Sequence, residues 1–264
     1  MKTPCKLSLA MLAVALIFGT ALLPSTAFSG GASVGSLNHP GFALPHGTIG
    51  VSSTASSSAP STGSLGNPNV VPPISNLEGK SYAEWSVAWW QRTLSNPFYQ
   101  GPGDLTGQYF PLHQSGPVWF LQGTVGPVER SCTMPSDTYL LCPLILYEND
   151  YPCPDTTFHP PYGQSLEDWL TAGAKAVIDG LTPPSLEVDG VALKNLTSYR
   201  ATSKLFTFTG DLSMQANFDA CITGSPQVAV SDGYLVILKP LSPGTHTLHF
   251  SGFGEVIVHL TVTR

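Results

Sequence analysis

The sequence has little charge and no cluster of basic residues. Only 11% of its 264 residues are Asp, Glu, Lys or Arg, and the net charge is −6. Proteins that bind nucleic acid or anionic membrane surfaces by electrostatics concentrate Lys and Arg, so neither is an expected partner. The 26 glycines and 24 prolines, with so few charges, are typical of a β-rich extracellular domain.

The motifs that identify common enzyme classes are also missing. The chain has no H-E-x-x-H, no P-loop and no dinucleotide-binding fingerprint. Residues 31–35 match the G-x-S-x-G pattern of serine hydrolases, but no expected strand precedes them and no expected helix follows. The absence of C-x-x-C means that neither a redox motif nor a zinc ribbon is indicated.

The one long apolar run lies at the N-terminus. Lys2 and Lys6 precede the apolar residues 7–23, and small residues follow, which is the pattern of a secretory signal peptide. We therefore expect residues 1–29 to be a signal peptide, with a retained membrane anchor as the alternative. The mature protein would be secreted (extracellular, periplasmic or at the cell surface), with no membrane span after signal removal.

The chain after the signal divides into a spacer and a folded part. Residues 30–73 are rich in Gly, Ser and Pro, and they cannot bury enough apolar area to offset the entropy of ordering. We expect them to form a flexible spacer. Residues 74–264 have the length of one globular domain.

Two segments of this domain have helical periodicity. Ser81 and Glu84 form a capping box, and Trp85 and Trp89 share the apolar face of the helix that follows. A second helix is expected over residues 165–181, where two prolines then end it.

The remainder is predicted to be β-strands. Pro143 interrupts one of them and implies an edge, a bulge or a break. In the last two strands the period-two pattern pairs Leu248 with Val258 and His246 with Leu260. We predict a mainly β fold, a single β-sandwich or jelly-roll-like domain with two short packed helices. The expected strands are residues 118–123, 139–146, 205–208, 228–230, 231–239, 245–250 and 256–263.

Four cysteines would remain after removal of the signal: Cys132, Cys142, Cys153 and Cys221. An even number in an oxidising compartment predicts two disulfides. Chain order suggests a short bridge within residues 132–153 and a long bridge to Cys221, although three pairings are open.

Two residues are candidates for ligand contact. Trp90 projects at an angle to the buried face of its helix, so it is the tryptophan expected to reach solvent or a cleft. Arg130 can clamp an anionic ligand through two hydrogen bonds, although a structural salt bridge or a backbone contact is the favoured interpretation.

Two groups are candidates for metal binding. His249 and His259 are diagonal neighbours in the predicted hairpin and can share a metal, but solvated strand histidines are the simpler interpretation. Glu148, Asp150 and Asp155 surround Cys153, and their oxygens suit Ca²⁺, with a disulfide-tied acidic loop as the favoured alternative. No other cofactor is expected.

Three sequence blocks occur together in this chain: residues 82–86 with Trp89 and Trp90, residues 116–121, and residues 232–234 followed by 239–244 and His246. Through these blocks the protein resembles a family of secreted bacterial β-rich proteins without an assigned function, over most of residues 80–262. The resemblance implies export and a single β-rich domain, and it implies no catalytic residues. Residues 241–248 are also similar to the closing strands of immunoglobulin-like extracellular modules, which bears on the fold alone.

Three functions are compatible with these features. The sparse charge, the spacer and the tryptophans favour a secreted or cell-surface binding module that recognises a polysaccharide or an envelope component. The alternative is a secreted hydrolase acting on a polymer or an ester, since catalytic groups meet in space rather than in sequence. A calcium-dependent structural protein is the third. The candidate catalytic groups are Glu84, His113, Arg130, Asp150 and His159.

Overall fold

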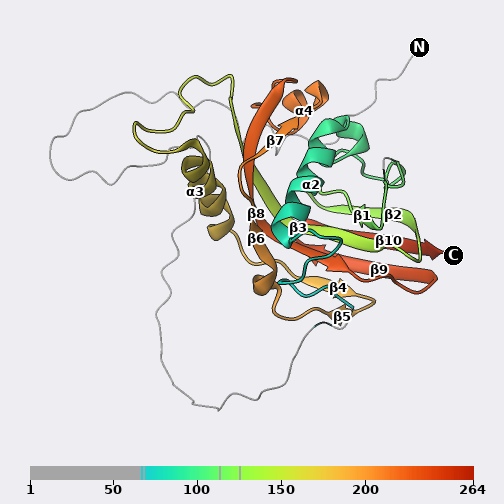
Figure 1. The fold of residues 1–264 in the computed structure, drawn as a ribbon. Coiled ribbons are helices and arrows are strands. Elements are labelled where there is room, and N and C mark those ends of the chain that lie inside the picture. Colours follow the sequence, from blue (N-terminus) through green and yellow to red (C-terminus); the bar gives the residue numbers. More distant parts are fainter. Residues whose placement is uncertain (1–66, 68, 113, 125) are drawn as a thin grey trace, which may run out of the picture. The chain divides into compact units, whose positions relative to one another are not determined.

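The computed structural model describes residues 67, 69–112, 114–124 and 126–264. The expected signal peptide, most of the expected spacer and His113 lie outside these residues. The described residues belong to one compact unit. Two five-stranded sheets and three α-helices build it (Figure 1).

The first sheet contains the two longest strands of the described chain, β3 and β8, which pair antiparallel. Its order is β1-β3-β8-β6, and β7 pairs with a further part of β8. β1 is parallel to β3, while β6 and β7 are antiparallel to β8. The strands are β1 (Val118–Phe120), β3 (Tyr139–Tyr151), β6 (Arg200–Thr202), β7 (Phe206–Thr209) and β8 (Pro226–Leu238).

The second sheet has the order β2-β10-β9-β4-β5. β2 lies parallel to β10, and every other pair is antiparallel. Buried and exposed residues alternate along β10, so this sheet turns one face to the core and one to solvent. The strands are β2 (Val128–Pro135), β4 (Leu186–Val188), β5 (Val191–Ala192), β9 (Gly244–Ser251) and β10 (Glu255–Thr263).

Helices α2 (Tyr82–Ser95) and α3 (Leu166–Asp179) cover opposite faces of the β3–β8 pair (Figure 1). From α2, the Trp90 Nε1 donates to Ser231 Oγ at 3.0 Å. On the other face, the Asn149 amide donates to the Leu170 carbonyl of α3 at 3.0 Å. Asn149 pairs with Val230, which precedes Ser231 in β8. Because successive strand residues point to opposite faces, Asn149 and Ser231 lie on opposite sides of the sheet. A short third helix, α4 (Leu212–Asn217), and two 3₁₀ helices, Phe98–Gln100 and Leu196–Tyr199, complete the described elements.

The mainly β, sandwich-like fold is confirmed, and so is the hairpin register. Leu248 pairs with Val258 in the β9–β10 hairpin, and both side chains are fully buried. Burial of one such side chain stabilises the fold by about 1.5–3 kcal/mol. The interruption at Pro143 is a bulge, because the β3–β8 register shifts between Pro143 and Ile145.

Some boundaries differ from the expected ones. Residues 228–230 and 231–239, expected as two strands, form the single strand β8. Val70 and Val71, which we assigned to the spacer, are buried, and the Val71 N–H donates to the Ile237 carbonyl. The packed part therefore begins a few residues before Ile74.

One of the two predicted disulfides is present. Cys153 is bonded to Cys221, 68 residues further on, as the long bridge requires. The expectation of a second bridge is wrong, because Cys132 and Cys142 are free, buried thiols. They lie in strands of different sheets, β2 and β3, and serve as small apolar core residues. Burial raises the pKa of the Cys132 thiol to about 11, so it stays protonated.

Candidate functional site

Four of the five candidate catalytic residues lie in the described part of the chain, and these four are dispersed. The Glu84 carboxylate accepts from the Ser81 N–H at 2.8 Å and completes the capping box of α2. Arg130 and Asp150 are buried in β2 and β3, whereas His159 is exposed in the loop after β3. The hydrogen bonds of these four residues go to separate partners. They do not converge on one cavity.

Trp90 does not reach solvent. Its exposed fraction is 3%, and its ring packs edge-on against Trp89 with centroids 4.7 Å apart. The expectation that Trp90 reaches solvent is therefore wrong, because the first sheet covers the side of α2 from which it projects. Trp85 and Trp89 are buried as predicted, and Trp169 is also buried. These tryptophans form no exposed stacking platform.

The Arg130 side chain forms hydrogen bonds with backbone carbonyls, which agrees with the favoured interpretation of a structural contact. Its guanidinium donates to the carbonyls of Asp104, at 3.2 Å, and Gln122. The side chain is 3% exposed. Arg130 therefore ties the segment before β2 to the second sheet and presents no clamp for an anion.

The solvent-facing side of the second sheet carries a regular array of mostly polar side chains. The register places its side chains in rows across three neighbouring strands, β2, β10 and β9. We call this surface the polar face. Its rows are Thr133–Thr261–Thr245, Ser131–His259–Thr247 and Glu129–Ile257–His249.

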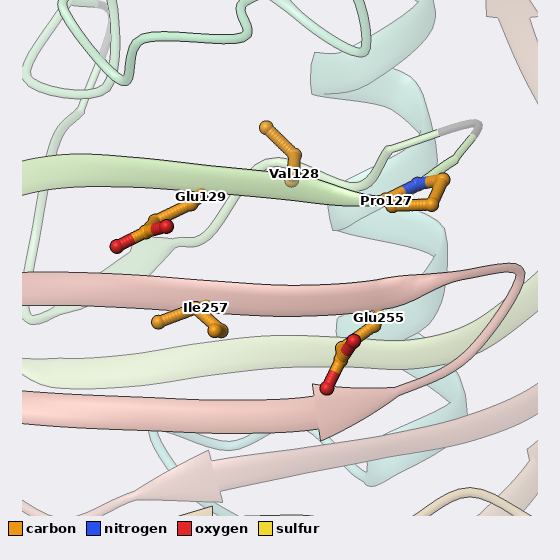
Figure 2. Close-up of a pocket in the computed structure, with 5 residues that line it drawn as sticks. All are labelled: Pro127, Val128, Glu129, Glu255 and Ile257. Carbon is orange, nitrogen blue, oxygen red and sulfur yellow. The ribbon is translucent and has the colours of Figure 1, made fainter. Parts of the chain in front are cut away.

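A shallow hollow of about 270 Å³ lies at one end of the polar face (Figure 2). Glu129 of β2 and Glu255 of β10 flank Ile257, with Pro127 and Val128 completing the lining. The hollow thus combines two carboxylates with two half-buried apolar side chains, Val128 and Ile257.

Each histidine of the polar face has its own carboxylate partner. His249 Nε2 lies 2.8 Å from Glu255 Oε1, and His259 Nε2 lies 2.8 Å from Glu129 Oε1. The two histidines are diagonal neighbours, as predicted from the hairpin register. Their ring nitrogens are directed to separate glutamates, however, and in the described part of the chain they join no metal-binding group.

A second grouping of polar side chains lies at the end of β3. Glu148 and Asp150 are buried, at 4% and 3% exposed, and the half-buried Asp219 lies beside Asp150. We call Glu148, Asp150 and Asp219 the acidic cluster. Burial, followed by the neighbouring Asp219 charge, raises the pKa of Asp150 to about 8. Burial, followed by the charges of Asp150 and Asp219, also raises the pKa of Glu148 well above its usual range.

The sequence reasoning placed these acids incorrectly. Glu148 and Asp150 are not in a loop but in strand β3, and Asp155 is exposed, with its carboxylate accepting from the Thr157 N–H. Asp219 was missed, since it lies 69 residues from Asp150 in the sequence. The available signal was its position two residues before Cys221, whose disulfide returns this segment to the end of β3.

A further hollow, lined by Lys175, Asp179, Arg200 and Thr202, holds an ion-paired arginine. Arg200 contacts Asp179 and the buried Asp232, both at 2.5 Å, so its charge is already compensated. Among the described residues, no helix has the length and apolarity needed to cross a membrane.

Comparison with protein-family models, with characterised proteins and with solved structures finds no match to this chain. The resemblance to secreted bacterial β-rich proteins therefore stays a prediction, and function has to be argued from the geometry described above.

Proposed function

We propose that the protein is a secreted or cell-surface binding module that recognises an uncharged polysaccharide, or an envelope component bearing one, through the polar face. The observation that carries the proposal is the register of β2, β10 and β9, which aligns hydroxyl, imidazole and carboxylate groups in rows on an exposed sheet face. The disulfide fits an oxidising compartment, and the N-terminal pattern is that of an exported chain.

The spacing of these groups suits a polymer of hydroxylated rings. Neighbouring strands lie about 4.8 Å apart, and alternate residues of one strand lie about 6.6 Å apart. Thr and Ser hydroxyls both donate and accept, whereas the carboxylates accept from sugar hydroxyls. Ile257 offers an apolar contact for the C–H face of a ring. Recognition would rest on these hydrogen bonds rather than on the tryptophans, which are buried or packed.

The direct experiment is retention of the purified protein on insoluble polysaccharides such as cellulose, chitin and peptidoglycan, followed by a glycan array. His259→Ala and Thr261→Val remove polar-face groups that are exposed and make no core contact. Each variant should lower affinity roughly threefold to tenfold, the effect of one lost hydrogen bond.

His159→Ala is the matched control, since His159 is an exposed histidine outside the polar face. It should be retained like the wild type. Failure of the wild type to bind any of the matrices and glycans would refute the proposal. Wild-type affinity in both polar-face variants would show that binding uses another surface.

A further inference from the structure

Ile257, which lines the hollow of the polar face, has four polar neighbours. Glu129 of β2 and His249 of β9 lie directly across from it on the two adjacent strands. Glu255 and His259 lie two residues before and two residues after it in β10, and therefore on the same side of the sheet. A half-buried apolar side chain is thus surrounded by polar groups from three strands.

The two histidines orient the two glutamates. His249 Nε2 contacts Oε1 of Glu255, and His259 Nε2 contacts Oε1 of Glu129, each at 2.8 Å. Within the described residues, Oε2 of each glutamate makes no hydrogen bond. The glutamate side chains are 65% exposed at Glu129 and 67% exposed at Glu255. Each carboxylate therefore keeps one accessible acceptor beside the apolar side chain.

The hollow is bordered at one end by the turn between β9 and β10. Gly254 of this turn lies so near the segment before β2 that a Cβ there would be 2.7 Å from the Pro127 nitrogen. Pro127 is the apolar side chain at this end, near Glu255 (Figure 2). At about 270 Å³, the hollow is smaller than the roughly 300–1,000 Å³ of pockets that enclose a whole small molecule. It therefore suits a substituent of a sugar ring, while the rest of a polymer follows the open sheet.

The lining matches the chemistry of an acetamido group. The methyl group would contact Ile257 and Pro127, and the N–H would donate to a glutamate Oε2. A hydroxyl group in the same place makes the hydrogen bond but leaves the apolar side chains uncovered. An ammonium group pairs with the carboxylates but loses hydration against the apolar lining. Carboxylate oxygen and apolar surface together therefore favour the acetamido group over the other two.

We propose that the ligand of the polar face is a polysaccharide of N-acetylated hexosamine units, and that the hollow recognises the acetamido group. This inference rests on the proposed glycan-binding function and names its substrate class. Burial of one methyl group and of the apolar surface that it covers should strengthen binding roughly fourfold to tenfold, relative to the same polymer with a hydroxyl in its place.

The test compares chitohexaose with cellohexaose by isothermal titration calorimetry. The two hexasaccharides have the same linkage and differ only in an acetamido or a hydroxyl group at one ring carbon. Chitohexaose should bind roughly fourfold to tenfold more tightly. A fully deacetylated chitosan hexamer carries an ammonium group at that carbon and should bind more weakly than chitohexaose.

The outcomes separate this inference from the proposed function. If cellohexaose or the chitosan hexamer binds as tightly as chitohexaose, the inference is wrong and glycan binding stands. The same holds if no glycan bound on the array carries an acetamido group. If the protein binds no glycan at all, the proposed function fails, and this inference fails with it.

One variant and one control locate the recognition. Ile257→Thr keeps a β-branched residue in β10 but replaces apolar surface with a hydroxyl, so it should reduce the preference for chitohexaose below about twofold. Thr261→Val changes an exposed residue of the same strand outside the hollow. It should weaken both ligands equally and preserve the preference. A wild-type preference in Ile257→Thr, with unchanged thermal unfolding, would show that the acetamido group is recognised elsewhere and would contradict the assignment to the hollow.

Discussion

Removal of the Cys153–Cys221 disulfide should destabilise the domain strongly. The bridge closes a segment of 68 residues, and the chain-entropy relation for that loop gives about 4.4 kcal/mol at 25 °C. This free energy comes from the unfolded state, because the unfolded chain has more conformational entropy when the bridge is absent. The double variant Cys153→Ser/Cys221→Ser should therefore lose about 4 kcal/mol of unfolding free energy, and its Tm should fall by about 10 °C.

Urea denaturation followed by tryptophan fluorescence measures this loss, because four of the five tryptophans are buried in the folded chain. EDTA should be present in every sample, so that any effect of a bound cation is removed. The m-value should rise in the variant, since an uncrosslinked unfolded chain exposes more surface. Wild-type protein in dithiothreitol should match the double variant. A loss below about 1 kcal/mol would refute the argument that this bridge acts by restricting the unfolded chain.

Three further predictions concern other parts of the fold. Cys132 and Cys142 should not react with a thiol reagent in the native protein, and both should react after denaturation. If neither thiol reacts after denaturation without a reductant, the two cysteines are disulfide-bonded, which would contradict the structure. Burial lowers the pKa of His246, but its hydrogen bonds to Asp189 and to a backbone carbonyl outweigh burial, so that the pKa is raised. The stability contributed by this pair is fully present below pH 6.5 and is lost as pH rises through the raised pKa, so Asp189→Asn should cost more in unfolding free energy at pH 5.5 than at pH 9. Gly233→Ala should prevent folding or cost several kcal/mol, as judged by soluble yield and circular dichroism, because φ is +144° and a Cβ there would lie 2.1 Å from a carbonyl oxygen of β3.

Local sequence patterns predicted the elements that depend on neighbouring residues. The capping box at Ser81 set the start of α2, and Pro143 marked the bulge in β3. The β9–β10 hairpin was predicted in register, because a short turn and a period of two leave one pairing that places the alternating apolar residues of both strands, such as Leu248 and Val258, on one buried face.

Strand β2 was not predicted, for a physical reason. Its inward positions carry Arg130, Cys132 and Met134, so a buried charge interrupts the apolar alternation. Arg130 is tolerated there only because distant carbonyls accept its hydrogen bonds, and no local pattern reports those contacts. The burial of Trp90 was missed on similar grounds, since the spacing within a helix does not show what packs over its sides.

The candidate sites were predicted in part. The diagonal placement of His249 and His259 was foreseen, but their separate glutamate partners were not, because Glu129 comes from β2. Asp150 was identified as an acid near Cys153 in the sequence. Asp219 was not, because it is distant in the sequence and lies beside Asp150 only in the folded chain, where the Cys153–Cys221 disulfide joins the two segments.

The parallel pairing of β2 with β10 has a consequence for the order of assembly. Residues 128–135 find their partners at residues 256–263, the last strand of the chain. During synthesis β2 emerges long before β10 exists, so this sheet must wait until residues 256–263 have emerged and then join segments more than 100 residues apart. Such long-range joining is slow, and deleting the final nine residues should leave β2 without its neighbour and the sheet unable to form.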